Sequence, residues 1–301
     1  MICLKCHLKI ENVTPHYGLH PKCFVDWFQA QDNSDFSSIQ RRSSGTSDKV
    51  SNQAPQNTSF FHGKFKKYSA ELNGIPYILK MRQKEAPELP EVEYLCNQIA
   101  SSLKIPIAEF YFIEFHGDRT FVTKNFIPRG RGPIDLQHIY HFRSDNQHSC
   151  SGLIKTIIEQ TKQPYDVKIL IKTILFDSLI GNHDRHGRNL AFIKTANTMS
   201  LSPIYDNVSY LSLESGNILQ TDFNPTGRIN TTETTEPTMR DYVKELKNLS
   251  YEQNIVEFYK NIKLPSLNSL IDKSFCSVLM KKAIKKLIKK RFEELENELF
   301  N

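Results

Sequence analysis

The sequence predicts an α+β fold in two lobes, with strands concentrated in the first lobe and helices in the second. Short apolar runs separated by turn residues fill residues 59–127, and the pair Asn73-Gly74 between two such runs is a strong β-hairpin signal. Residues 165–180 are largely apolar over the length of a helix, which predicts a buried helix. Helical spacing returns near Thr238 and continues towards the end of the chain.

We expect the lobes at residues 1–127 and 128–301, because the β-rich pattern stops near residue 127. A chain of 301 residues is long enough for two such lobes. Residues 31–59 are rich in Ser, Asn, Gln, Asp and Thr with little apolar content, so we expect a mobile loop there.

The order of the remaining elements follows from turn and helix-start residues. Pro87 and Pro90 precede a helical pattern, and His116-Gly117-Asp118 separates two apolar runs. We expect a hairpin at residues 59–80, a helix at 89–103, strands at 108–115 and 120–127, and a flexible Gly/Arg/Pro segment at 128–133. The buried helix at 165–180 follows, and then a short strand pair at 190–194 and 199–205.

Composition limits the class of protein. The longest apolar runs are shorter than the roughly 18 residues of a membrane span, and the N-terminus lacks the apolar core of a signal peptide. Six cysteines are too few for a disulfide scaffold in this length, so we expect a cytoplasmic protein with reduced thiols. The net charge of +6 owes part of its excess to residues 281–291, a basic helical pattern. We favour a surface helix with a solvated lysine face, and the alternative is a patch for an acidic partner or nucleic acid.

A polar segment directly after the buried helix carries the chemistry. In Gly181-Asn182-His183-Asp184-Arg185-His186-Gly187-Arg188-Asn189, a carboxylate precedes an amide by five residues, and Asp206 follows seventeen residues later. Phosphoryl transfer needs one carboxylate to orient a hydroxyl, and an amide plus a second carboxylate to hold Mg²⁺. Asp184 is the candidate for the first role, and Asn189 and Asp206 for the second. A polar loop with turn and cap residues is the alternative, and the three spacings together favour catalysis.

Upstream residues fit the same chemistry. Lys80 ends a predicted strand and is a candidate ligand of the α- and β-phosphates of ATP. Glu93 lies on the next helix, where it can pair with Lys80 or serve only as a carboxylate favoured near the helix N-terminus, and the sequence leaves these two roles open. For Glu91 the helix N-terminus is a sufficient explanation. Position alone makes residues 121–127 the candidate lobe connection, whose backbone groups would contact the edge of adenine. Lys124, Asn125 and Phe126 are the expected ATP contacts within it.

Histidines and cysteines have weaker signals. For His183, Arg185 and His186 we favour packing or hydrogen bonding, with His186 also a candidate ATP contact. Two residues separate Cys3 from Cys6, two separate His20 from Cys23, and thirteen lie between these pairs. This spacing is compatible with a tetrahedral Zn²⁺ site made by Cys3, Cys6, His20 and Cys23. The alternative is that these cysteines are small core residues.

Several segments in one order resemble the HipA-type serine/threonine kinases of bacterial toxin–antitoxin systems. The first matches are His20-Pro21-Lys22-Cys23-Phe24, Tyr77-Ile78-Leu79-Lys80 and Glu93-Tyr94 with Cys96. The loop from Gly181 to Asn189 and Ser202-Pro203-Ile204-Tyr205-Asp206 complete the set. The resemblance implies a two-lobed protein-kinase-like fold, ATP, Mg²⁺, and transfer of the γ-phosphoryl group to a protein serine. The family's targets are aminoacyl-tRNA synthetases.

The same resemblance implies autophosphorylation in the loop that covers the phosphates. Ser38-Ile39-Gln40 is the best match to the family's serine motif, which makes Ser38 the expected site. Ser37, Ser43 and Ser44 are the alternatives, because the residues after Ser38 depart from the family pattern.

The start of the chain at the Cys/His segment makes it resemble the short form, HipT, of HipBST systems. The expected partners are then a small HipS-like antitoxin and a HipB-like DNA-binding protein, with DNA reached only through the latter and no membrane contact. Two other functions stay open. Phosphoinositide-type lipid kinases share the Asp-Arg-His-x2-Asn spelling, and a pseudokinase would act as a binding module.

Overall fold

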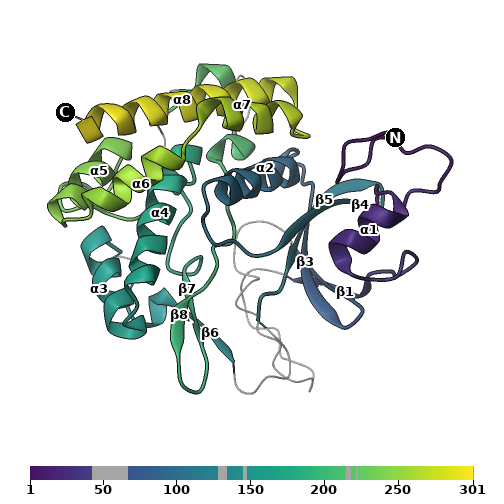
Figure 1. Ribbon diagram of the computed structural model, residues 1–301, viewed down its shortest axis with the longest axis horizontal. Coiled ribbons are helices and arrows are strands. Elements are labelled where there is room, and N and C mark those ends of the chain that lie inside the picture. The colour runs from purple at the N-terminus through teal and green to yellow at the C-terminus, as the bar shows by residue number, and fades with distance from the viewer. Residues whose placement is uncertain are drawn as a thin grey trace. The chain divides into compact units, whose positions relative to one another are not determined.

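A computed structural model describes residues 1–42, 67–127, 134–144, 148–214, 218–221, 223–224 and 226–300 (Figure 1). The chain forms two compact units. The first unit comprises Met1–Tyr94 and Ala108–Phe126, and the second comprises Leu95–Ile107 and Ile127–Asn301. Helix α2 (Leu89–Ser102) contributes to both units. A β-rich first unit and a mainly helical second unit confirm the predicted α+β fold.

The first unit is built on an antiparallel sheet of five described strands in the order β1-β2-β3-β5-β4. The strands are β1 (Ser37–Arg42), β2 (Lys67–Leu72), β3 (Ile75–Met81), β4 (Phe110–Phe115) and β5 (Asp118–Lys124). Asn73 and Gly74 both have positive φ, 50° and 76°, as a two-residue hairpin turn requires. The predicted hairpin is therefore confirmed over its described part.

Strand β1 corrects the loop expected at residues 31–59. Ser37–Arg42 pairs with β2 through a register irregularity between Ser37 and Gln40. Backbone groups make a β-ladder whatever the side chains are, so this polar strand depends on its partner and not on its own pattern. Residues 31–36 form neither helix nor strand, and residues 43–59 of the expected loop lie outside the described residues, as does the segment at 128–133.

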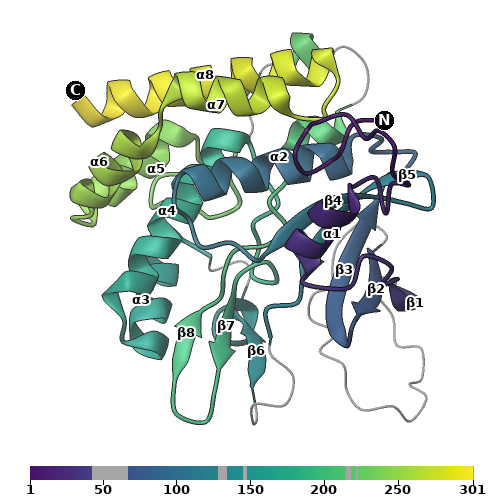
Figure 2. The same ribbon diagram turned by 45° about the vertical axis from the view of Figure 1, so that its right-hand side comes forward.

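Helix α1 (Pro21–Phe28) lies against the strands of this sheet (Figure 2). The contact is made by aromatic side chains. Phe28 is almost fully buried, and its ring lies 4.6 Å from Tyr111, 5.6 Å from Phe36 and 5.7 Å from Tyr77, measured between centroids. Such contacts between rings stabilise beyond the apolar area that they bury. The core of the first unit is therefore an aromatic cluster between α1 and the strands.

The second unit surrounds one buried helix, α4 (Pro164–Ile180), which confirms the prediction for residues 165–180. Helices α3, α5, α6 and α8 all contact α4. The remaining helices are α3 (Cys150–Thr161), α5 (Met239–Asn248), α6 (Glu252–Asn261), α7 (Leu264–Lys273) and α8 (Val278–Phe300), with short 3-10 helices at Ile139–His141, Tyr210–Leu213 and Ile218–Gln220. No helix of the described residues is long and apolar enough to cross a membrane.

A small antiparallel sheet in the order β6-β7-β8 completes the described second unit. Strands β7 (Ala191–Lys194) and β8 (Met199–Leu201) confirm the expected strand pair, although the second strand ends earlier than residue 205. Strand β6 (Asp135–His138) was not expected, because four residues are too few to show an alternating pattern.

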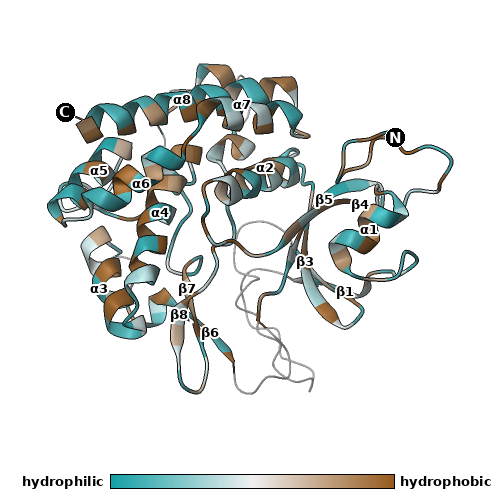
Figure 3. Cartoon of the chain, viewed as in Figure 1, coloured by the Kyte–Doolittle hydropathy of each residue, from teal (hydrophilic) through white to brown (hydrophobic). Residues whose placement is uncertain are grey.

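The basic helix α8 has one buried face. Hydrophobic and hydrophilic bands alternate along it in Figure 3, and Ala283, Ile284, Leu287 and Ile288 are all buried. On the other face, Lys285 pairs with Asp272 at 2.6 Å. These contacts fit the surface-helix interpretation of the basic run.

Candidate functional site

The loop after α4 is anchored to the last turn of that helix. Gly181 ends α4 with φ 68°, a left-handed conformation in which a Cβ is unfavourable. The Asn182 amide nitrogen Nδ2 donates to Asp177 Oδ1 at 2.9 Å, and Asn182 Oδ1 accepts from the Asp184 N–H at 3.1 Å. Asn182 therefore holds the backbone of Asp184 at a fixed position relative to the end of α4.

Asp184 presents its carboxylate to solvent, with 60% of the side chain exposed. His186 Nε2 lies 3.8 Å from Asp184 Oδ1, and His186 Nδ1 accepts from the Arg188 N–H at 3.1 Å. A ring nitrogen that accepts carries no proton, so the Nε2 of a neutral His186 carries it and faces the carboxylate. An exposed carboxylate beside an imidazole N–H can orient and deprotonate a hydroxyl group.

Arg185 is the buried centre of this loop, with 1% of the residue exposed. Its guanidinium makes a two-point ion pair with Asp177, at 2.8 and 2.9 Å. Burial alone lowers the pKa of Arg185, but the charge and hydrogen bonds of Asp177 outweigh burial and raise the pKa above its ordinary value. Arg185 is thus a fixed positive charge at the base of the loop.

The same guanidinium joins two separate segments. Arg185 Nη1 donates to the backbone oxygens of Tyr205 at 2.7 Å and Asn189 at 3.3 Å, and Nη2 donates to Asn207 Oδ1 at 2.6 Å. The segments that carry Asn189 and Asp206 therefore lie side by side. The sequence favoured a packing or hydrogen-bonding role for Arg185, but it did not indicate that this one side chain would bond to several separate segments.

Asn189 is held with its amide oxygen available. Its Nδ2 donates to the Asp184 carbonyl at 2.9 Å, and its Oδ1 accepts no hydrogen bond from the described part of the chain. Asp206 is half-buried with φ 55°, and burial first, then the charge of Asp206, raise the pKa of the neighbouring Tyr205. One amide oxygen and one carboxylate are donor types that Mg²⁺ accepts.

In the first unit, Lys80 on β3 forms an ion pair with Glu93 on α2, which is one of the two arrangements that the sequence left open. Both side chains are buried, at 7% and 1% exposed. The Lys80 ammonium also lies 5.7 Å from the centre of the Phe121 ring. The carboxylate and the ring hold the ammonium in one place, as phosphate binding would require.

Glu91 has a larger role than a helix N-terminus gives it. It is 1% exposed and pairs with Arg82, with Arg119 at 3.7 Å. Neither arginine was singled out from the sequence, because each stands alone on its strand or loop without a local pattern. A second buried carboxylate therefore anchors α2 beside Glu93.

The segment expected to contact adenine is fixed within the first unit. The N–H groups of Lys124 and Asn125 donate to the carbonyls of Glu109 and Pro76, at 2.9 and 3.0 Å. The Lys124 side chain pairs with Glu109 at 3.0 Å. Burial raises the pKa of Glu109, but hydrogen bonds from Lys124 and Tyr111 outweigh burial and lower it. Phe126 ends this segment and this unit.

Two of the candidate serines, Ser37 and Ser38, lie at the irregularity of β1. Ser38 is exposed with φ 52°, and the Ser37 hydroxyl donates to the Glu71 carbonyl at 3.3 Å. Ser43 and Ser44 lie outside the described residues.

The structure brings the four candidate zinc ligands together. One ligand atom from each of Cys3, Cys6, His20 and Cys23 lies within 4.8 Å of every other. Burial by itself raises the pKa of Cys3, but backbone N–H groups and the Cys6 side chain outweigh burial and lower it to about 6. Burial first, and then the hydrogen bonds and charges of Cys6 and Cys3, raise the pKa of Cys23 to about 12. None of the six cysteines, all of which are described, forms a disulfide.

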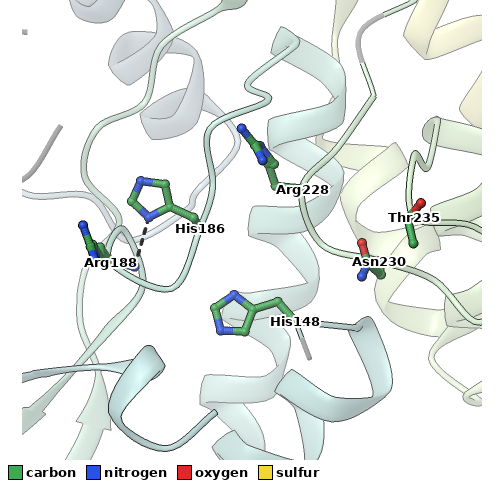
Figure 4. A pocket seen from close by; sticks show the side chains of 6 residues that line it. All are labelled: His148, His186, Arg188, Arg228, Asn230 and Thr235. Carbon is green, nitrogen blue, oxygen red and sulfur yellow. Dashed lines mark hydrogen bonds between the residues drawn. The ribbon is translucent and has the colours of Figure 1, made fainter. Parts of the chain in front are cut away.

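A basic pocket of about 410 Å³ opens beside the loop of Asp184 (Figure 4). Its lining residues come from four segments of the second unit and are His148, His186, Arg188, Arg228, Asn230 and Thr235. Arg228 Nε donates to the His183 carbonyl at 3.2 Å, which ties this distant segment to the loop. None of these six lining side chains is a carboxylate. This pocket could not be predicted from the sequence beyond the histidine and arginine of the loop itself.

A family model, the HipA-like C-terminal domain, matches residues 42–265. The chain belongs to the HipA-like family. The resemblance noted in the motifs is thereby confirmed, and the Cys/His segment lies outside the matched region. The chain is 28% identical over 153 residues to a putative kinase of Haemophilus influenzae. That alignment covers 44% of this chain and 45% of the Haemophilus protein, so the match spans about half of the relative's length.

Two solved structures have the same fold as this HipA-like chain. The proinflammatory kinase CtkA of Helicobacter pylori has a TM-score of 0.63 at 17% identity, covering 77% of this chain and 92% of CtkA. HipA of Shewanella oneidensis, solved in complex with HipB and operator DNA, has a TM-score of 0.54 at 16% identity. The latter alignment covers 74% of this chain and 58% of the Shewanella protein. The chain therefore has the kinase-like fold of these proteins.

The residues of this HipA-like chain fit the ATP and Mg²⁺ that a kinase uses. In the second unit, Asn189 Oδ1 and the Asp206 carboxylate are oxygen donors on adjoining segments, as a hard cation requires. In the first unit, Lys80 is a buried and fixed ammonium, suited to a phosphate.

Proposed function

We propose that this HipA-like chain is an ATP-dependent kinase that transfers the γ-phosphoryl group to a serine or threonine hydroxyl of a protein. The observation that carries the proposal is the buried pair of Lys80 and Glu93, because a lysine and a carboxylate so placed are recurring parts of protein kinases. The loop from Asp184 to Asn189, fixed by Arg185, supplies the other recurring parts.

The proposed transfer is a single in-line displacement. The hydroxyl oxygen of the substrate bonds to the γ-phosphorus, the bond from that phosphorus to the bridging oxygen breaks, and ADP leaves. Asp184 accepts the hydroxyl proton, and Lys80 contacts the α- and β-phosphates. Asn189 and Asp206 would hold Mg²⁺, which when bound neutralises charge on the phosphates. Lys124, Asn125 and Phe126 are the proposed adenine contacts, with His186 near the phosphates.

We also propose a role as the toxin of a toxin–antitoxin system. The Shewanella relative was solved with HipB and operator DNA, which supports a HipB-like partner and DNA contact only through that partner. A HipS-like antitoxin, an aminoacyl-tRNA synthetase as target and the HipT subtype belong to the same proposal. So does autophosphorylation at Ser38, whose exposed position in β1 makes its hydroxyl accessible. A phosphate there adds about two negative charges at pH 7.

The test is phosphoryl transfer from γ-labelled ATP to proteins of a cell lysate and, in parallel, to phosphoinositide vesicles. Asp184→Asn should lower kcat by roughly 100-fold or more, because it removes the proton acceptor without a change of shape. The matched control is Asp135→Asn, an exposed aspartate on β6, which should keep wild-type activity. Labelled lipid with unlabelled protein would instead indicate a lipid kinase, and full activity of Asp184→Asn would overturn the assignment of Asp184.

Lys80→Met provides a second test of the proposed kinase activity. It should raise the KM for ATP and also lower kcat, because Lys80 would bind the phosphates in the ground state and bind them more strongly in the transition state, when charge develops on the leaving ADP. Absence of any transfer by the wild type, together with unchanged ATP binding by Lys80→Met, would favour a binding module over an enzyme.

A further inference from the structure

We propose that Cys3, Cys6, His20 and Cys23 bind one structural Zn²⁺ ion. These residues lie outside residues 42–265, so the family match assigns them nothing. Among the described residues, they form the one group of at least three Cys, His, Asp or Glu side chains whose ligand atoms all lie close together.

The distances between the ligand atoms suit a tetrahedral site. With Zn–S near 2.3 Å and Zn–N near 2.0–2.1 Å, a sulfur and a nitrogen ligand at tetrahedral corners are about 3.6 Å apart. Cys6 Sγ lies 3.5 Å and Cys23 Sγ 3.8 Å from His20 Nδ1. A cation between these atoms therefore needs only small movements of the side chains.

The histidine is already oriented for a metal. His20 Nε2 lies 3.2 Å from the Lys9 carbonyl oxygen, to which it can only donate, so Nδ1 carries the lone pair. That lone pair points to the side on which the sulfur atoms lie. A ligand histidine that donates its other nitrogen to a carbonyl is the usual arrangement around structural zinc.

The backbone around the ligands also fits. Cys3 and Cys6 flank a tight turn in which the His7 N–H donates to the Cys3 carbonyl at 3.0 Å, and His7 has φ 60°. The second pair lies at the start of α1, where His20 is the N-cap residue and Cys23 belongs to the first turn. Two short loops with little core of their own are thus placed around one point, as in small zinc modules.

All four positions around the ion would be filled by protein atoms, which makes the site structural and not catalytic. Its effect would be to tie the first nine residues to α1. Because Phe24 and Phe28 of α1 belong to the aromatic cluster on the sheet, loss of the metal should loosen that cluster while the second unit stays folded. Binding would release a proton from each thiol that is still protonated.

The test is the metal content of protein purified without chelator. We expect one zinc per chain in the wild type. After removal of zinc, added Co²⁺ should give the intense visible bands of tetrahedral thiolate coordination. Cys6→Ser should lose the metal, and because Cys6 is exposed, this change cannot act by disturbing a core. Cys276→Ser is the matched control and should keep one zinc.

A conservative exchange separates coordination from packing. His20→Cys should keep zinc as a four-cysteine site, whereas His20→Ala should lose it. Wild-type protein with no stoichiometric metal and no cobalt bands would overturn the proposal. So would a Cys6→Ser protein with wild-type zinc content, or a disulfide among these cysteines in protein isolated under reducing conditions.

A different observation carries a second inference, which rests on the proposed kinase activity. The geometry points to the basic pocket beside Asp184 as the binding site for an acidic side chain of the protein substrate. Arg188 and Arg228 are exposed, and the terminal nitrogens of both guanidinium groups make no ion pair or hydrogen bond with the described residues. The six side chains in Figure 4 include two arginines, two histidines and no carboxylate.

The position of the pocket decides the kind of ligand. His186 both lines the pocket and lies 3.8 Å from the Asp184 carboxylate, so an occupant would be a near neighbour of the accepting hydroxyl. Uncompensated guanidinium groups at a surface attract carboxylates and fix them by paired hydrogen bonds. A glutamate or aspartate close to the phosphorylated serine meets both conditions.

Binding can be measured without catalysis. Fluorescent serine peptides with acidic or neutral flanking residues are titrated with the protein, and anisotropy gives Kd. The wild type should favour the acidic peptide, and Arg228→Ala should weaken that peptide alone by roughly tenfold. Arg240→Ala, an exposed arginine on α5 outside the pocket, is the control and should bind as the wild type.

Equal binding of both peptides by the wild type, or an unchanged Kd in Arg228→Ala, would overturn the pocket assignment. Failure of the kinase proposal would look different. The peptides would still bind, but Asp184→Asn would not change the amount of phosphate transferred from ATP.

Discussion

Replacing Arg185 by methionine should destabilise the second unit more than any other single change in the loop. The change keeps an unbranched side chain of similar length and removes five hydrogen bonds, two of them to the Asp177 carboxylate. Asp177 is 5% exposed and would keep its contact with Asn182 alone among the described side-chain partners.

The magnitude follows from what remains buried. A buried ion pair that loses one partner costs about 3–5 kcal/mol, since the other charge stays out of water. That is a large share of a domain's stability of about 5–15 kcal/mol. At roughly 2–4 °C per kcal/mol for a domain of this size, Tm should fall by about 10 °C.

The assay is urea and thermal unfolding followed by circular dichroism. Arg188→Met is the matched control, because this arginine lies three residues further on and is exposed, so its loss should cost about 0.5 kcal/mol or less. A double variant, Arg185→Met with Asp177→Asn, removes both charges and should be more stable than the sum of the single changes predicts, by roughly 1–3 kcal/mol. If Arg185→Met unfolds within about 1 kcal/mol of the wild type, or if the two changes are additive, the reasoning is wrong.

Two further changes test other parts of the second unit. Burial lowers the pKa of His183, with Arg228 adding to the effect and Asp184 opposing it, so its contribution to stability is fully present above the unfolded pKa of about 6.5. That contribution is lost as pH falls below the unfolded pKa and through the lower pKa of the folded state. His183→Gln should therefore reduce the loss of unfolding free energy between pH 8 and pH 5, and an unchanged loss would contradict this account. A Cβ at Gly227 would lie 1.8 Å from the Tyr242 hydroxyl oxygen, so Gly227→Ala should cost about 1–3 kcal/mol in denaturant unfolding. Gly117→Ala, with no atom within 4 Å and only its φ of 83° to oppose it, should cost about 1–2 kcal/mol, and a Gly227→Ala protein that is no less stable than Gly117→Ala would count against the clash.

Local patterns predicted the parts of the fold that depend on neighbouring residues. The hairpin at Asn73-Gly74 and the helix at 165–180 are of this kind, because turn residues and apolar runs act over a few positions. Strands β1 and β6 were missed, since their residues are polar or few and only the pairing with a distant strand makes them extended.

The candidate site divides in the same way. The spacing of Asp184, Asn189 and Asp206 was visible, whereas the role of Arg185 was not, because arginine is seldom fully buried and a single one carries no pattern. Asp177 in the last turn of a largely apolar helix was the available signal for a buried cationic partner. The pocket could not be predicted, because Arg228 and Asn230 belong to a segment whose position depends on tertiary contacts.

The irregular strand that carries Ser38 has a mechanical consequence. Among the described strands, β1 lies at the end of the sheet and is hydrogen-bonded to β2 alone. An edge strand attached along one side can peel away while the four remaining strands keep their ladder, so its opening free energy is far below that of global unfolding. A hydroxyl on such a strand can leave its place and return without the loss of the fold. The register irregularity between Ser37 and Gln40 marks the point at which that opening would begin.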